Sequence, residues 1–165
     1  MTKKSTLKAL MLLLALTPTL WMSSCSTIED GDYVSPITQY EKMGGTWRVN
    51  SVTQIDETNQ KSMALTGLFD FESFAIHLGT DASGNPTSYT ISGSAPALLP
   101  VSGQWKLENP FVNSDGSSAK VLLNENTALT VTAMPGAQQS LEFKLTRTQN
   151  GNAFVSYVYN LVPAE

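Results

Sequence analysis

Polar and apolar residues alternate along most of the chain from residue 46 onward. Late in the chain Leu141, Phe143 and Leu145 take every second position, with Glu142 and Lys144 between them. A period of two places successive side chains on opposite faces of a β-strand. The same pattern, bounded by turn residues, predicts eight strands, at 46–55, 72–79, 87–92, 102–107, 119–124, 127–133, 139–148 and 153–162.

The connections between these strands are rich in Gly, Pro, Asn, Asp and Ser, which favours hairpin turns. Consecutive antiparallel strands can close on themselves and so remove exposed edges. We therefore predict an all-β fold, an eight-stranded antiparallel up-and-down barrel with a short N-terminal helix. Ser35 and Pro36 suit the start of that helix, and Gly44 and Gly45 suit its end. The connection 57–71 is long enough for a helix or a lid.

The phase of each strand predicts which side chains face the barrel interior. In the first strand Trp47, Val49 and Ile55 share a face if the strand carries no bulge. The bulky inward positions of other strands, which we predict to line a possible ligand pocket, are Phe74, Ile76, Tyr89, Trp105 and Phe143.

The N-terminus has the layout of a signal peptide. Lys3, Lys4 and Lys8 precede an apolar run, 9–16, which is too short to span a bilayer and is followed by small residues. We predict a lipoprotein signal peptide at 1–24. The alternatives are a cleaved signal of a soluble secreted protein, with Cys25 incidental, and a buried helix.

The segment MSSC, Met22 to Cys25, resembles the bacterial lipobox, although Met22 and Ser24 depart from its usual residues. The resemblance implies that Cys25 carries lipid, and acyl chains at about 0.8 kcal/mol per buried methylene would hold the protein on a membrane. Cys25 is the single cysteine, so no internal disulfide can form.

A polar segment, 25–35, follows and is acidic at Glu29, Asp30 and Asp32. We interpret it as a flexible tether that resembles the signal directing lipoproteins of Bacteroidetes to the outer face of the outer membrane. A solvated spacer on the periplasmic face is the alternative. The sequence has no Lys/Arg run and a formal charge of −4, which argues against nucleic-acid binding.

The rest of the chain suits one globular domain, which we place at 36–165. The sequence has 165 residues, of which 41% are hydrophobic and only 15% are charged. A chain of this size can build a single core, and the low charge favours strands and polar turns over long surface helices.

Two Gly-x-Trp segments give the domain a family resemblance. GTW, Gly45 to Trp47, opens the first strand after a short helix, as the corresponding motif does in lipocalins. The resemblance implies that Trp47 closes one barrel end and that a late arginine, here Arg147, lies over its ring. The segment SGQW, Ser102 to Trp105, is similar to a feature of the lipocalin-like lipoproteins of gut Bacteroidetes, which are largely domains of unknown function. The resemblance covers about residues 36 to 163.

Candidate catalytic and metal-binding residues are few. His77 is the only histidine and lies out of phase with its apolar neighbours, so it lacks the partners of a triad or a zinc site. Asp70 and Glu72 could pair as carboxylates but fit a solvated strand start better. The segments DASGN and NSDGSS faintly resemble calcium loops but lack the closing Glu. We predict that the protein is not an enzyme and holds no metal or cofactor.

Two functions from different classes remain. The first is a binding module whose barrel interior, or mouth near 56–71, holds a small apolar or glycan-derived ligand. The second is a structural lipoprotein of the cell envelope whose filled barrel docks to a protein partner. The family resemblance favours ligand binding.

Overall fold

The computed structural model describes residues 38–94, 99–109 and 118–164. The predicted signal peptide, Cys25 and the tether lie outside these ranges. The elements, in chain order, are α2 (Gln39–Met43), β1 (Gly45–Asp56), β2 (Lys61–Ala64), a short 3₁₀ helix η1 (Phe71–Ser73), β3 (Ala75–Thr80), β4 (Pro86–Ser92), β5 (Ser102–Leu107), β6 (Lys120–Leu123), β7 (Thr127–Ala133), β8 (Leu141–Gln149) and β9 (Asn152–Pro163).

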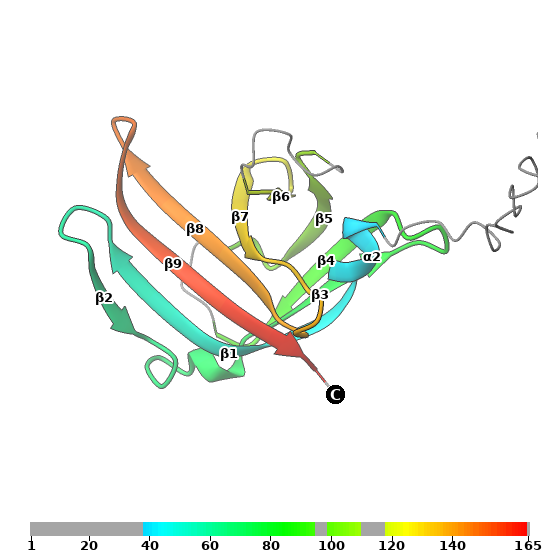
Figure 1. Ribbon diagram of the computed structural model, residues 1–165, viewed down its shortest axis with the longest axis horizontal. Helices are drawn as coiled ribbons and strands as arrows, with labels where there is room; N and C mark the ends of the chain where they lie inside the picture. The colour runs from blue at the N-terminus through cyan, green and yellow to red at the C-terminus, as the bar shows by residue number, and fades with distance from the viewer. Residues whose placement is uncertain (1–37, 95–98, 110–117, 165) are drawn as a thin grey trace, which may run out of the picture. The chain divides into compact units, whose positions relative to one another are not determined.

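Eight of these strands form a closed antiparallel barrel (Figure 1). From β3 onward each strand pairs with the next, β1 pairs with β3, and β9 returns to pair with β1. The predicted all-β, up-and-down barrel with one short helix is confirmed, and β5 and β7 begin and end where the alternation placed them.

Strand β1 changes neighbours halfway along its length. Its first residues, Gly45 to Arg48, pair with β3, whereas Thr53 to Asp56 pair with the short strand β2. Strand β9 runs along the other side of β1 throughout. As a result β2 extends the sheet beyond the barrel, and β1 and β3 are no longer paired at that end (Figure 1).

A β-bulge in β1 reverses the phase of its second half. The register with β9 shifts between Val49 and Ser51, so one extra residue stands in β1. Val52 is therefore the next fully buried position, and Ile55 lies on the opposite face from Trp47. The expectation that Ile55 would share the face of Trp47 held only without a bulge and is wrong.

The long connection 57–71 forms neither a helix of its own nor a detached lid. It makes the turn into β2, and Leu65 and Phe71 then pack into the core. The helix η1 occupies the start of the strand predicted at 72–79, so pairing begins at Ala75 rather than at residue 72. Buried apolar side chains thus fill the place where β1 leaves β3.

The short helix α2 begins later than Ser35 and Pro36 suggested. Thr38 is its N-cap: the side chain of Thr38 accepts from the amide of Glu41, and the Glu41 carboxylate accepts from the amide of Thr38. The chain leaves the helix at Gly44 and enters β1 at Gly45, which has a φ of +118° that glycine tolerates best.

Candidate functional site: a pocket at the Trp47 end of the barrel

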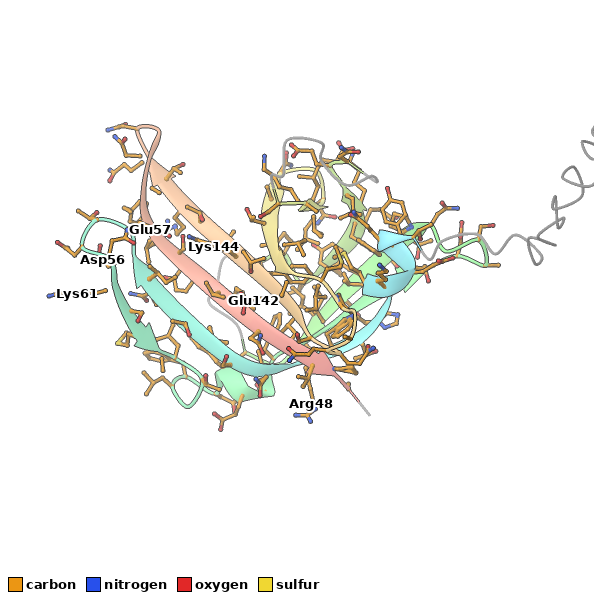
Figure 2. All side chains as sticks on the ribbon, viewed as in Figure 1. Arg48, Asp56, Glu57, Lys61, Glu142 and Lys144 are labelled. Atoms are coloured by element: carbon orange, nitrogen blue, oxygen red, sulfur yellow. The ribbon has the colours of Figure 1, made fainter. Side chains whose placement is uncertain are left out.

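The first Gly-x-Trp segment closes one end of the barrel. Trp47 is only 4% exposed, and its indole Nε1 donates a hydrogen bond to the carbonyl oxygen of Met43 at 2.7 Å. Met43 is the last residue of α2, so the indole fastens the helix to the strand that follows it. Arg48, the next residue, is exposed on the outer face (Figure 2).

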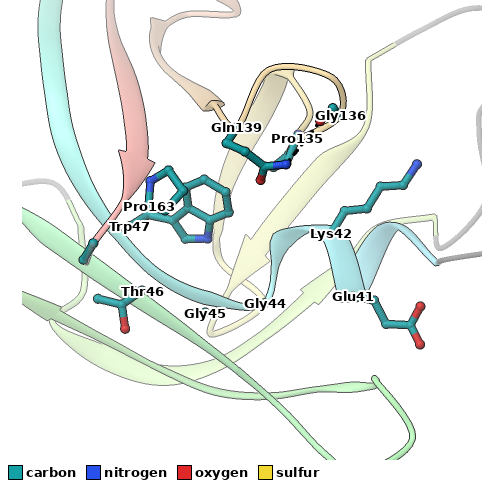
Figure 3. Close-up of a pocket in the computed structure, with 11 residues that line it drawn as sticks. Glu41, Lys42, Gly44, Gly45, Thr46, Trp47, Pro135, Gly136, Gln139 and Pro163 are labelled. Atoms are coloured by element: carbon teal, nitrogen blue, oxygen red, sulfur yellow. Dashed lines mark hydrogen bonds between the residues drawn. The ribbon is translucent and has the colours of Figure 1, made fainter.

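An open pocket of about 510 Å³ lies beside Trp47 (Figure 3). Three parts of the chain meet there: α2 with the start of β1, the loop between β7 and β8, and the end of β9. The lining residues are Glu41, Lys42, Gly44, Gly45, Thr46, Trp47, Pro135, Gly136, Gln139, Pro163 and Ala164. This volume falls within the range of pockets that bind small molecules.

The pocket combines an apolar base with a polar rim. Trp47, Pro135 and Pro163 supply rings, while Gln139 donates from Nε2 to the carbonyl oxygen of Gly136 at 3.2 Å. Because Glu41 is occupied with capping α2, its carboxylate is held at the helix start. Rings with a few polar groups around them suit an apolar face of a ligand that also carries hydrogen-bonding groups.

The second Gly-x-Trp segment is built into the core instead of a pocket. Trp105 is buried, donates from Nε1 to the carbonyl oxygen of Gly79 at 2.7 Å, and meets the Tyr40 ring edge-on at 6.1 Å between centroids. Gly103 has a φ of +152°, and a Cβ there would lie 1.7 Å from Oδ1 of Asn124. The contacts of this segment therefore fix the position of β5 against the core.

Arg147 does not lie over Trp47, and this prediction is wrong. Its guanidinium stands 5.4 Å from the centroid of the Phe154 ring. In the barrel register Arg147 faces Val155 of β9, whereas Trp47 faces Pro163. Eight residues of strand separate these positions, which is about 26 Å at 3.3 Å per residue.

The five residues predicted to line a pocket are all buried in the core, and none lines the pocket beside Trp47. These are Phe74, Ile76, Tyr89, Trp105 and Phe143. Their inward orientation follows from the alternation. Their assignment to a ligand site stays a prediction.

Candidate catalytic groups are exposed and engaged in local contacts. His77 lies on the outer face of β3 with Nδ1 2.9 Å from Oγ1 of Thr46. Asp70 and Glu72 flank Phe71 as exposed residues. The Asp81 carboxylate accepts from the amides of Asn85 and Ser83, and these hydrogen bonds, that from Asn85 first, lower its pKa. The DASGN segment is thus organised as a turn.

Across 38–94, 99–109 and 118–164, no group of three or more His, Cys, Asp or Glu side chains could hold a metal ion. In the same part of the chain, no helix has the length and apolar character needed to cross a bilayer.

An ion pair on the outer face ties the β1–β2 turn to β8 (Figure 2). Nζ of Lys144 lies 2.7 Å from Oε1 of Glu57, and Oγ1 of Thr146 lies 2.8 Å from Oγ of the fully buried Ser156. The hydrogen bond from Lys144, followed by one from Ser156, lowers the pKa of Glu57. This cluster is structural and lies away from the pocket.

The pocket could not be found from the strand pattern because loops build much of it. Pro135, Gly136 and Gln139 belong to the AMPGAQQ segment, which the alternation reads only as a turn. The usable signal was Gly44–Gly45 before Trp47, since glycines leave room beside a large ring.

Comparison with known proteins identifies a family. The family described as domain of unknown function DUF5004 matches residues 23–162. Neither a curated protein nor a solved structure matches the chain.

Proposed function

The chain belongs to the DUF5004 family, and on that premise we propose that it is a membrane-anchored, non-catalytic protein that binds a small ligand. The ligand is apolar or glycan-derived, in keeping with the resemblance to lipocalin-like lipoproteins of Bacteroidetes. The pocket beside Trp47 is the observation that carries the proposal.

The pocket suits such a ligand because of what lines it. Trp47 and the two prolines offer apolar ring surfaces, and Gln139 adds an amide able to hydrogen-bond. Ring surfaces contribute burial of apolar area, while a few polar groups set the orientation of the ligand. A sugar derivative or a compact apolar molecule has both kinds of surface.

The anchor in this proposal is lipid on Cys25, which places the barrel at the outer membrane. The acidic tether favours the outer face over the periplasmic face. A Cys25→Ala variant should lose labelled palmitate and leave the membrane fraction. Retention of both would rule out the anchor without touching the pocket.

Native mass spectrometry of the full chain purified from its host tests ligand binding. We expect a small molecule bound at one per chain. Gln139→Ala should lower its occupancy, and Gln138→Ala is the matched control because Gln138 is the exposed neighbour that does not line the pocket. Equal occupancy in both variants, or a bare chain, would contradict the proposed pocket.

The second candidate is a structural envelope protein that docks to a partner through its outer surface. The packed interior favours it, because bulky inward side chains such as Tyr89, Trp105 and Phe143 are almost completely buried. Cross-linking in intact cells that captures one partner protein through outer-face residues, with no small molecule bound, would favour this candidate.

A further inference from the structure

The short strand β2 forms a free edge on an otherwise closed sheet (Figure 1). Among residues 38–94, 99–109 and 118–164, every strand of the barrel pairs with a neighbour on each side, whereas β2 pairs only with β1. All four residues of β2, Lys61 to Ala64, are exposed. A free edge presents unpaired N–H and C=O groups, with which a strand from another chain can pair.

The pairing with β1 decides which backbone groups of β2 face this edge. The amide of Leu65 donates to the carbonyl oxygen of Val52 on β1 at 2.8 Å. Hydrogen-bonded residues alternate along an antiparallel pair of strands, so Met63, two residues before Leu65, also directs its backbone groups at β1. Ser62 and Ala64 therefore direct their N–H and C=O groups at the free edge.

Exposed apolar side chains lie beside this edge. Met63 on β2 is 51% exposed, and Leu68 and Phe69 in the following loop are 44% and 77% exposed. The amide of Leu68 donates to the carbonyl oxygen of Leu65 at 2.8 Å, which folds this loop back toward the end of β2. A group of exposed apolar side chains marks an interaction surface, whereas single ones are common on any protein.

The free edge of β2 is complementary to itself when two copies meet in antiparallel order. With Met63 of one copy opposite Met63 of the other, Ser62 of each copy faces Ala64 of its partner. Both outward-facing residues of each strand then exchange N–H and C=O hydrogen bonds with the partner. A pairing centred on Ser62 or on Ala64 would bring the other of these two residues opposite a residue outside β2.

The distribution of charge also favours a second copy. Segment 62–69 contains no charged residue. Lysine on an edge strand often opposes pairing, but Lys61 lies opposite Asp56 on β1 within its own copy. In the antiparallel pairing centred on Met63, Lys61 faces Leu65 of the partner, so the two lysines do not oppose each other. The partner's chain continues from Leu65 to Asp70, which brings opposite charges toward the same end of the joint.

We propose that two copies of the chain form a symmetric dimer in which their β2 strands pair, with Met63 at the two-fold axis. The two barrels then share one continuous antiparallel sheet. The two Met63 side chains pack against each other, and the loops that carry Leu68 and Phe69 lie at the two ends of the new pairing. None of these residues lines the Trp47 pocket, so dimerisation and ligand binding can be tested separately.

Disulfide cross-linking of the full chain in intact host cells tests this pairing. Met63→Cys places two thiols at the axis, where a pair that is not hydrogen-bonded has Cα atoms about 4.5 Å apart, close enough for a disulfide. Ser62→Cys is the matched control, because two such residues would lie diagonally, about 7–8 Å apart, which is too far. The wild type, whose single cysteine is Cys25, gives the background.

After mild oxidation we expect Met63→Cys to migrate at twice the monomer mass on a denaturing gel and to return to the monomer mass on reduction. Ser62→Cys and the wild type should stay at the monomer mass. Adding Ser62→Pro to Met63→Cys should lower the cross-linked fraction about tenfold, because proline removes an N–H from the free edge of both copies and none that bonds β1. Adding Ser62→Ala instead should leave the cross-linked fraction unchanged.

Three results would overturn the proposal. These are a Met63→Cys chain that stays at the monomer mass, equal cross-linking of Met63→Cys and Ser62→Cys, and a cross-linked fraction that Ser62→Pro does not lower. A Met63→Cys chain that becomes joined to a different protein, and not to a second copy, would likewise show that this edge serves another partner.

Discussion

The two Gly-x-Trp segments share the same hydrogen-bonding arrangement and differ in what surrounds it. In both, a glycine with positive φ stands two residues before a tryptophan, whose indole donates to a backbone carbonyl at 2.7 Å. Around Gly45 there is open space, and Trp47 borders a pocket; around Gly103 there is the Asn124 side chain, and Trp105 is enclosed. The same three-residue pattern therefore borders a surface pocket in the first segment and lies in the packed core in the second.

Of the substitutions in the two segments, the one at Gly103 should destabilise the protein most. In Gly103→Ala the new Cβ would displace the Asn124 amide, which accepts from the amide of Gln104 and donates to Ser102 and Tyr89. Loss of these hydrogen bonds and the backbone strain should lower the free energy of unfolding by about 3–5 kcal/mol. Urea denaturation measures it, and a loss below that of Gly45→Ala would contradict the role given to Asn124.

Substitutions of the two tryptophans should cause the next largest losses of stability. Trp47→Phe and Trp105→Phe each remove the indole donor, which leaves a carbonyl without its partner and costs about 1–3 kcal/mol. The cost should be larger at Trp105, because the smaller ring also weakens the edge-on contact with Tyr40. Equal losses in thermal unfolding would mean that enclosure of the second segment adds nothing.

A substitution at Gly45 tests the effect of backbone strain without steric crowding. No atom lies within 4 Å of a Cβ built at Gly45, so Gly45→Ala adds only the penalty of a φ of +118°. We expect a loss of about 1–2 kcal/mol in the free energy of unfolding. A loss as large as that of Gly103→Ala would show that steric crowding is not what distinguishes the two glycines.

The smallest effect should come from the cap that precedes the first segment. Thr38→Ala removes the side-chain acceptor for the amide of Glu41 and should cost about 1 kcal/mol. Thr58→Ala, an exposed threonine whose amide, not its hydroxyl, bonds Asp56, serves as the control. A Thr38→Ala chain with the wild-type melting temperature would show that the Thr38 side chain adds nothing to the stability of α2.

Period-two alternation was enough to predict the eight barrel strands and their faces, since burial follows that alternation in nearly every strand. It could not predict the bulge at residue 50. The residue types in β1 give no sign of the one extra residue that reverses the phase of the strand. It also could not predict β2, whose four residues are all exposed and so lack an apolar face.

Arg147 shows a different limit. Its face was read correctly from the phase of β8, yet a phase says nothing about which end of a barrel a residue occupies. The end is set by strand direction: β1 and β8 both run antiparallel to β9, so the start of β1, with Trp47, and the end of β8, with Arg147, lie at opposite ends of the barrel. The pocket residues of the β7–β8 loop were beyond prediction for a related reason, because turn residues carry no periodicity.

The pairing of β1 with β9 also sets the order in which the molecule can be completed. These strands join residues about a hundred positions apart, and closing so long a loop is entropically costly and slow. Every other strand of the barrel can pair with its neighbour as soon as both exist, but β1 must keep one edge unpaired until β9 has been synthesised. A chain that folds while it is being synthesised therefore stays open along the β1 edge until β9 is available to pair with it.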